Sequence, residues 1–347
     1  MSRLNGPART NRPAKLIDVA RHAGVSTGTV SNVLNHPDKV KEGTSARVMR
    51  SIEHLGFVRD TNASSLANGG SHDIGLVVID LANSIFLDAA RGAQSTARAA
   101  GLNLLMAGSE NDFGVQSSNV DSFIGARVAG LLLAPMQDSS AQIQRLTKRH
   151  VPVVLVNYDP GTDHACSVIV DNDAAGYIAA RHLIDLGRRR IAFVSVDWDL
   201  QPVEQRRHGI RRAVAETDGA VTLEEIVADD LEVGSGNAIA RQVAARDAAE
   251  RPDAVVAVTD NLAVGFIEQA ADLGIDVPGD IAVMGTDDNT SAARCRLTLT
   301  TVTMQGRQLG AVAMELLMDE IRHGRDEHRH QRVVLTPQLV VQQSTVR

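Results

Sequence analysis

The chain has 347 residues, of which 44% are hydrophobic and 3% aromatic, so it can hold a small module and a two-lobed globular body. Its net charge of -7 is unevenly spread, because residues 1–72 carry +5 and the remaining residues carry -12. A basic head on an acidic body does not exclude a nucleic-acid partner for the head. The sequence contains no run of about 20 apolar residues, the length that a membrane-spanning helix needs, so no such helix is predicted.

The N-terminal residues and the two cysteines predict a soluble cytoplasmic protein. Residues 1–13 are polar and basic, without the apolar core of a signal peptide. Cys166 and Cys295 have no metal-ligand or redox spacing, so we expect buried free thiols in a reducing compartment. We expect no metal and no cofactor.

Residues 1–14 predict a disordered arm, and residues 15–56 predict a small DNA-binding domain of three helices. The first two helices are joined by a tight turn at Gly24, and Ser26 is a good N-cap for the second. Apolar side chains at helical spacing are expected to form the core. They are Ile17, Val19, Ala20, Val30, Val33 and Leu34, with Ala46, Val48, Met49, Ile52 and Leu55 from a third helix near residues 42–55.

The outer face of the second helix carries only small or polar side chains. A helix that enters the DNA major groove, about 12 Å wide, needs such a face. The helix-turn-helix pattern therefore indicates duplex DNA as the partner. The alternative is a packed helix pair in another kind of domain, but apolar packing alone would not require the polar pattern.

The pattern D-V-A-x-x-A-G-V-S-x-x-T-V-S-x-V-L-N in residues 18–35 resembles the lactose-repressor (LacI/GalR) family of bacterial transcription regulators. The resemblance covers residues 15 to about 345. It implies a ligand-responsive repressor of carbohydrate or related catabolic genes that binds a pseudo-palindromic operator as a homodimer. It further implies that Thr27, Gly28 and Asn32 read bases. The residues expected to contact phosphates are Ser26, Thr29, Ser31 and Asn35.

Residues 57–72 predict a hinge that ends in a flexible Ala-Asn-Gly-Gly-Ser composition. The resemblance implies that Leu66 is a wedge for the minor groove at the operator centre. Alternatively, Leu66 packs against its dimer mate. The hinge departs from the family at four positions, where a proline, an asparagine and two basic residues are usual: Arg59, Asp60, Ser64 and Ala67.

Residues 73–347 alternate short apolar runs with helical stretches, which predicts buried parallel strands in two doubly wound α/β lobes. The resemblance implies that these lobes bind effector and dimerise. The runs of the first series are residues 74–79, 102–106, 130–133 and 151–156. Those of the second series are residues 167–170, 191–196, 225–227, 254–258 and 281–284. The lobes resemble the type I periplasmic-binding-protein fold, in which residues 299–324 return to the first lobe.

Ligands of such lobes bind beyond the carboxyl ends of strands. The resemblance implies that Arg206, in an R-x-x-G motif, holds effector oxygens and that Asp287 accepts hydroxyl hydrogen bonds. The other effector positions it implies are Asp80, Asn83, Phe86, Asn157, Tyr158 and Leu231. Asp80 and Asp287 could instead cap helices. Leu231 stands where many relatives carry a ring, which favours a sugar or small polyol over a purine.

Several alternatives stay open at this stage. Trp198 could stack on a ligand or cover a lobe, and an effector could either release or recruit DNA. A solute-binding protein is the rival class, although the missing signal peptide and basic head argue against it; a regulator with a non-sugar effector is another. The chain has no G-x-x-x-x-G-K-[ST], H-E-x-x-H or G-x-S-x-G motif, so we expect no enzyme. Residues 336–347 lack a heptad repeat, which favours a dimer over a tetramer.

Overall fold

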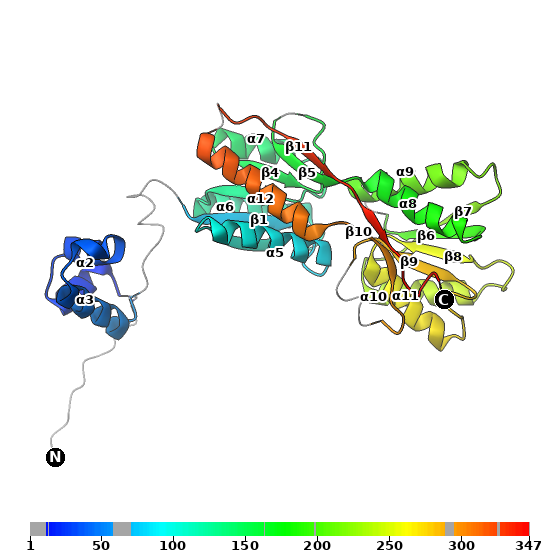
Figure 1. Cartoon of the computed structure of the whole chain (residues 1–347), viewed down its shortest axis with the longest axis horizontal. Helices are drawn as coiled ribbons and strands as arrows, with labels where there is room; N and C mark the ends of the chain where they lie inside the picture. The colour runs from blue at the N-terminus through cyan, green and yellow to red at the C-terminus, as the bar shows by residue number, and fades with distance from the viewer. Residues whose placement is uncertain are drawn as a thin grey trace, which may run out of the picture. The chain divides into compact units, whose positions relative to one another are not determined.

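The computed structural model describes residue 12 and residues 14–57, 71–162, 164–197, 199–288, 295–324 and 327–346. The chain divides into two compact units, Met1–Ser71 and His72–Arg347 (Figure 1). Most of the predicted arm, most of the predicted hinge with its wedge Leu66, and Trp198 lie outside the described residues. Among the helices of the described part, none has the length and apolar character needed to span a bilayer.

The first unit is the predicted helix-turn-helix. It consists of α1 (Leu16–Ala23), α2 (Thr27–Asn35), the short 3-10 helix η1 (Pro37–Lys39) and α3 (Glu42–Leu55). Gly24 ends α1 with φ 63°, a left-handed conformation that glycine adopts without strain. Ser26 caps α2, because its Oγ accepts a hydrogen bond from the Thr29 N–H at 3.1 Å.

The core of this unit differs from the predicted one at three positions. Ile17 and Met49 are 52% and 50% exposed, and Ala46 is also exposed. Met49 follows the buried Val48 and is turned about 100° away from it around α3, since successive residues of an α-helix are separated by that angle. Ile17 lies two residues before the buried Val19 and therefore points to nearly the opposite side of α1. Buried Ser51 helps close the core instead, donating to the Arg47 carbonyl at 2.9 Å and lying 3.0 Å from His22 Nδ1. The buried apolar residues are Val19, Ala20, Ala23, Val30, Val33 and Val48.

The second unit contains two six-stranded sheets, which confirms the predicted α/β class. The first sheet has the order β11-β5-β4-β3-β1-β2, and its paired strands are parallel. Its strands are β1 (Asp73–Val78), β2 (Asn103–Gly108), β3 (Gly130–Leu133), β4 (Val153–Val156), β5 (Cys166–Val170) and β11 (Arg332–Leu335). Helices α5 (Ser84–Ala99) and α12 (Gly306–His323) pack on one face, and α6 (Phe113–Ala126) and α7 (Ser140–Lys148) pack on the other.

The second sheet has the order β12-β10-β9-β8-β6-β7, in which only the β10–β12 pair is antiparallel. Its strands are β6 (Arg190–Ser195), β7 (Thr222–Val227), β8 (Ala254–Ala257), β9 (Ala282–Gly285), β10 (Thr300–Thr303) and β12 (Gln338–Val340). Helices α8 (Asn172–Asp185) and α9 (Gln201–Ala215) lie on one side, and α10 (Val233–Ala244) and α11 (Asp260–Asp272) lie on the other (Figure 1).

One predicted strand belongs to the other lobe. Residues 167–170 were expected in the second series, but β5 pairs with β4 in the first sheet, with Val154 opposite Cys166. The chain then crosses to the second lobe before α8, returns before α12, and crosses again between β11 and β12. Helix α12 packs on the first lobe, as predicted, but the start of the same predicted segment stays in the second lobe, where residues 300–303 form β10 between β9 and β12. An apolar run predicts burial on both faces, but it does not specify which sheet supplies the hydrogen-bonding partners.

Candidate functional sites

The exposed face of α2 is the candidate DNA-binding face. Thr27, Gly28 and Asn32, predicted to read bases, are exposed, and so is Ser26. The other predicted phosphate contacts, Thr29, Ser31 and Asn35, are half-buried. They make local bonds: the Ser26 and Thr29 hydroxyls lie 2.9 Å apart, and Asn35 Nδ2 donates to Ser31 Oγ at 3.2 Å. The exposed side chains of this face are therefore Thr27 and Asn32, with the cap Ser26 at its start.

The charge of this unit suits a polyanion. The exposed cationic side chains in its described part include Lys15, Arg21, Lys39, Lys41, Arg47 and Arg50. Asp18 is used locally, since its Oδ2 accepts from the Lys15 backbone N–H at 2.9 Å at the start of α1. That hydrogen bond is the largest cause that lowers the pKa of Asp18, and Arg12 adds to it. Cations around an uncharged reading face provide sequence-independent attraction to phosphates.

A cleft of about 500 Å³, open space at its mouth included, lies between the two lobes of the second unit. We call it the interlobe cleft. The first lobe lines it with Ile79, Asp80, Asn83, Ile85, Phe86, Asn111 and Asn157, and the second lobe with Leu200, Pro202, Val203, Arg206, Leu231, Val258 and Thr259. Of the eight predicted effector residues, the cleft brings together Asp80, Asn83, Phe86, Asn157, Arg206 and Leu231.

Arg206 is held rigidly in the wall of the cleft, where it is 6% exposed. Its Nε donates to Asn172 Oδ1 at 2.9 Å, and its Nη1 donates to the Val258 carbonyl at 2.7 Å and to Thr286 Oγ1 at 2.9 Å. Within the described residues, Nη2 has no hydrogen-bond partner. A pre-positioned guanidinium with one nitrogen to spare can donate to ligand oxygens without losing side-chain entropy on binding.

Asp287 lies outside the lining of the cleft, contrary to the predicted hydroxyl acceptor. Its buried Oδ2 accepts a long hydrogen bond of 3.4 Å from the Asp260 N–H. Burial, and then the Asp260 charge, raise the pKa of Asp287 well above its usual value, although the Arg206 charge opposes this shift. Burial likewise lowers the pKa of Arg206, while Asp287 and Asp260 counteract that effect. Asp287 therefore helps the buried Arg206 to keep its positive charge.

Three other predicted residues have structural roles. Tyr158 does not line the cleft and packs against the core cluster beside α6 and α7. Burial is the main cause that raises the pKa of its phenol, followed by nearby carboxylates. Asn83 caps α5 by accepting from the Ile85 N–H at 3.1 Å, and Asp80 Oδ1 accepts from the Ala82 N–H at 2.8 Å. These bonds fix the loop after β1 while both residues still line the cleft.

Several cleft residues escaped the sequence prediction. Asn111 and Thr259 line the cleft, and Asn172 orients Arg206. Asn111 and Asn157 share a left-handed backbone, with φ 58° and 54°. Asparagine tolerates this conformation better than most residues, so an asparagine beyond a predicted strand was the available clue. The apolar wall had no such clue, because its residues are ordinary core types.

Asp80 of the cleft lining has an acidic neighbour in the second lobe, Glu232, which follows the lining residue Leu231. Burial is the largest cause that raises the pKa of Glu232 in the second lobe, and the charge of Asp80 in the first lobe is the next. Asp230 adds a smaller effect in the same direction. The cleft is therefore acidic near Asp80 and would repel an anionic ligand.

The sequence matches two known families. Residues 15–60 match bacterial regulatory proteins of the lacI family, and residues 180–345 match a periplasmic binding protein-like domain. The chain is 32% identical over 304 residues to catabolite control protein A of Priestia megaterium, covering 87% of this chain and 91% of that protein. It is 30% identical over 330 residues to the HTH-type transcriptional repressor PurR of Vibrio campbellii, covering 94% and 97%.

Solved structures support the same architecture. A LacI-family transcriptional regulator from Silicibacter pomeroyi has a TM-score of 0.82 at 22% identity, covering 96% of this chain and all of that one. The lac repressor dimer bound to operator and the anti-inducer ONPF has a TM-score of 0.78 at 23% identity, with 97% and 100% covered. The transcriptional regulator CelR in complex with cellobiose has a TM-score of 0.69 at 27% identity, with 96% and 100% covered.

Proposed function

The chain belongs to the lacI family of bacterial regulatory proteins, and on that basis we propose that it represses transcription as a dimer on a pseudo-palindromic operator. We further propose that a small uncharged polyol or sugar in the interlobe cleft changes the affinity for that operator. Its relatives are named as regulators and repressors rather than as enzymes.

The observation that supports the effector class is the composition of the interlobe cleft. Arg206 Nη2 provides a donor at its wall, and the amides of Asn83, Asn111 and Asn157 provide donors and acceptors around it. Hydroxyl groups donate and accept, so a polyol can satisfy such a mixed set. The remaining lining is mostly aliphatic, which suits the C–H face of a small sugar.

The charge of the cleft supports a neutral ligand. The phosphate of a phosphorylated sugar would be repelled by Asp80 and by its acidic neighbour Glu232. The positive charge of Arg206 is already partly offset by Asp287 and Asp260. Among the lining residues that the structure describes, Phe86 alone is aromatic, and the rest of the lining is aliphatic or polar rather than the pair of rings that would suit a purine. These features favour a pentose or similar polyol over a sugar phosphate or a nucleobase.

The test begins with the operator. The purified full-length chain is used to select duplexes from a random pool, and the affinity for the selected sequence is measured by fluorescence anisotropy. Calorimetry then tests pentoses, hexoses, linear polyols, sugar phosphates and purines. We expect a symmetric sequence to emerge, and one neutral polyol to bind and change the affinity for DNA.

Matched variants distinguish the cleft from other surfaces. Arg206→Ala should abolish polyol binding while operator affinity without ligand stays unchanged. Arg211→Ala, on the same helix but 59% exposed and paired with Glu225, should leave both activities intact. Binding of only a sugar phosphate or a purine would overturn the effector class, and failure to select any DNA sequence would overturn the operator proposal.

A further inference from the structure

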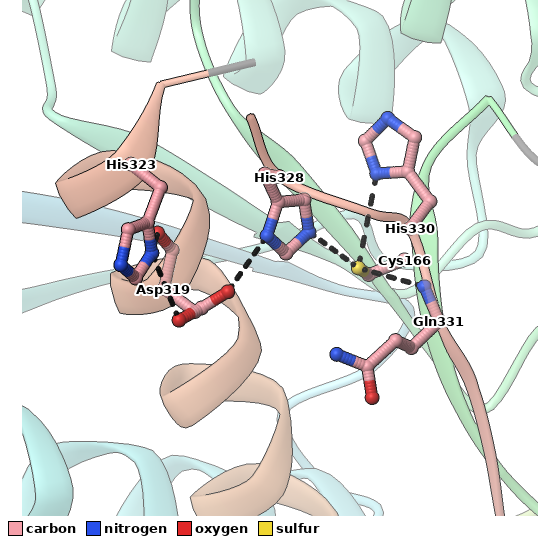
Figure 2. Close-up of polar contacts among 6 residues, drawn as sticks. All are labelled: Cys166, Asp319, His323, His328, His330 and Gln331. Carbon is pink, nitrogen blue, oxygen red and sulfur yellow. Dashed lines mark hydrogen bonds and ion pairs between the residues drawn. The ribbon is translucent and has the colours of Figure 1, made fainter. Parts of the chain in front are cut away.

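Three side chains with metal-ligand atoms converge at the amino end of β5 (Figure 2). They are Cys166, His328 and His330. Cys166 Sγ lies 3.1 Å from His328 Nε2 and 3.8 Å from His330 Nδ1, and all three ligand atoms lie within 4.8 Å of one another. We call this group the Cys-His-His cluster.

The fold assembles this cluster from distant parts of the chain. Cys166 is the first residue of β5, and β11 pairs with β5 in parallel, with Arg332 opposite Ser167. His328 and His330 precede β11 and therefore lie, like Cys166, at the amino end of these two paired strands. The cysteine is more than 160 residues from either histidine in sequence. This separation explains why cysteine spacing gave no indication of the cluster.

Neighbouring groups orient the ligands. His328 Nδ1 lies 2.8 Å from Asp319 Oδ2 near the end of α12, and the His328 side chain is fully buried. If Nδ1 carries the proton and donates to this carboxylate, the Nε2 lone pair faces Cys166 Sγ. Histidines that bind metals usually donate their second N–H to such a carboxylate. The Gln331 backbone N–H also donates to Sγ at 3.2 Å, a contact that would stabilise a thiolate.

We propose that Cys166, His328 and His330 bind one Zn²⁺ ion, with a fourth position open to water or another ligand. With Zn–S of about 2.3 Å and Zn–N of about 2.0–2.1 Å, tetrahedral sulfur and nitrogen ligands lie about 3.5 Å apart. The observed sulfur–nitrogen distances of 3.1 and 3.8 Å bracket this value. On binding, the Zn–S bond forms, the thiol proton leaves to solvent, and both imidazoles bind in their neutral form.

The donor set also selects the kind of metal. One thiolate and two imidazoles suit borderline and soft ions, whereas Mg²⁺ and Ca²⁺ prefer oxygen ligands. Zn²⁺ imposes little geometric preference of its own and accepts sets of nitrogen and sulfur. Small rotamer changes at the half-buried His330 would be enough to shorten its 3.8 Å contact with sulfur.

Cys166, His328 and Asp319 also have the order of a nucleophile, a base and an orienting acid. Their burial disfavours catalysis. Cys166 and the His328 side chain are 0% exposed, so the described chain gives a substrate no access to the sulfur. Burial is the main cause that raises the pKa of the Cys166 thiol, whereas an activated cysteine has a lowered pKa. A metal ion needs far less space, and it would use His330, which has no part in such a triad.

The Cys-His-His cluster and the interlobe cleft lie at opposite ends of the strands of the first sheet. Parallel strands all begin at the same end of a sheet, and Cys166 is at that end. The cleft residues Ile79 and Asp80 instead follow the carboxyl end of β1. A metal ion would join β5 to the segment that leads from α12 to β11. The cluster would therefore be a second ligand site, independent of the effector.

The test uses the untagged full-length chain after treatment with a chelator, and Co²⁺ as a spectroscopic substitute for Zn²⁺. We expect one equivalent of Co²⁺ to produce a thiolate-to-cobalt charge-transfer band and the visible bands of tetrahedral cobalt, both removed by Zn²⁺. Cys166→Ser should remove the charge-transfer band, and His330→Ala should abolish tight binding. Asp319→Asn should weaken Zn²⁺ binding by about 10- to 100-fold.

Two controls make the result decisive. Cys295→Ser removes the other free cysteine, and His323→Ala removes the histidine that contacts Asp319 without facing the sulfur (Figure 2); both should bind like the wild type. Circular dichroism without metal establishes that each variant is folded, and His330→Ala is the safer variant because that side chain is half-buried. Equal Co²⁺ binding by Cys166→Ser and the wild type, or a titration without a thiolate band, would overturn the proposal.

Discussion

At the residue scale, buried charges in the second lobe balance one another around Arg206. The guanidinium is fixed by Asn172, Val258 and Thr286, and the buried carboxyl of Asp287 interacts with it electrostatically. An isolated buried charge is unfavourable, and a partner offsets only part of the desolvation. This balance makes Asp287 sensitive to pH, even though it does not line the cleft.

The folded chain holds the Asp287 proton more tightly than the unfolded chain, because burial raises its pKa well above 3.8. The stability that comes from this proton is present below pH 3.8 and is lost as pH rises through the folded-state pKa. Asp287→Asn should therefore gain free energy of unfolding, relative to the wild type, as pH rises from acidic to neutral. Urea unfolding across this range measures the gain, and the exposed Asp288→Asn is the matched control. The prediction would be wrong if the difference in unfolding free energy between Asp287→Asn and the wild type became smaller as pH rises.

A second single residue, Asn32 in the first unit, can be tested for its effect on DNA recognition. Its amide is exposed on α2 and can form paired hydrogen bonds with adenine. Asn32→Ala should relax the preference at one base pair by about 1–3 kcal/mol. Competition between the selected operator and its single-base variants measures this preference. Equal weakening on every sequence would instead assign Asn32 to the phosphates.

At the scale of elements, close helix pairs position the cleft residues. α8 and α9 approach so closely that a Cβ on Gly176 would lie 2.0 Å from the Arg206 carbonyl oxygen, and one on Gly209 would lie 1.9 Å from that of Asp173. Reciprocal glycines occur in two other pairs, α5 with α12 and α10 with α11. Glycine is required here by the close approach of two backbones.

Gly209→Ala should separate α8 from α9 and displace Arg206, which α9 carries. We expect a loss of about 1–3 kcal/mol of unfolding free energy, as for other overpacked substitutions, together with weaker effector binding. Urea unfolding and calorimetry measure the two effects. Gly234→Ala in α10 is the control, because a Cβ there has no neighbour within 4 Å. It should be neutral or stabilise by up to about 1 kcal/mol. Equal effects of the two substitutions would refute the packing argument.

At the scale of the whole molecule, the chain crosses between the lobes at three places, and both lobes line the cleft. A ligand that contacts both lobes can favour one angle between them, and thereby one of two states of the protein. Such coupling between ligands is typically 1–3 kcal/mol.

The coupling must be reciprocal if it is an equilibrium effect. The factor by which the proposed effector changes operator affinity should equal the factor by which operator DNA changes effector affinity. Anisotropy and calorimetry on the same preparation give the two factors, and Arg206→Ala should bring both to one. Unequal factors at a protein concentration that keeps the dimer intact would exclude a single two-state coupling.

The sequence by itself determined the local features. Helical periodicity and the caps at Gly24 and Ser26 predicted the helix-turn-helix, and apolar runs predicted the strands of an α/β body. These features depend on neighbours within a few residues, so local patterns contain them. The resemblance added six residues that the interlobe cleft brings together.

Only the tertiary structure decided which distant segments meet. It assigned β5 to the first sheet, buried Asp287 outside the cleft lining but within electrostatic reach of Arg206, and brought Cys166 beside two histidines. Each outcome depends on strand pairing or helix packing between segments far apart in the chain, and periodicity carries no information on such pairing. Local patterns therefore indicate which segments form helices and buried strands, whereas the fold decides which segments become neighbours.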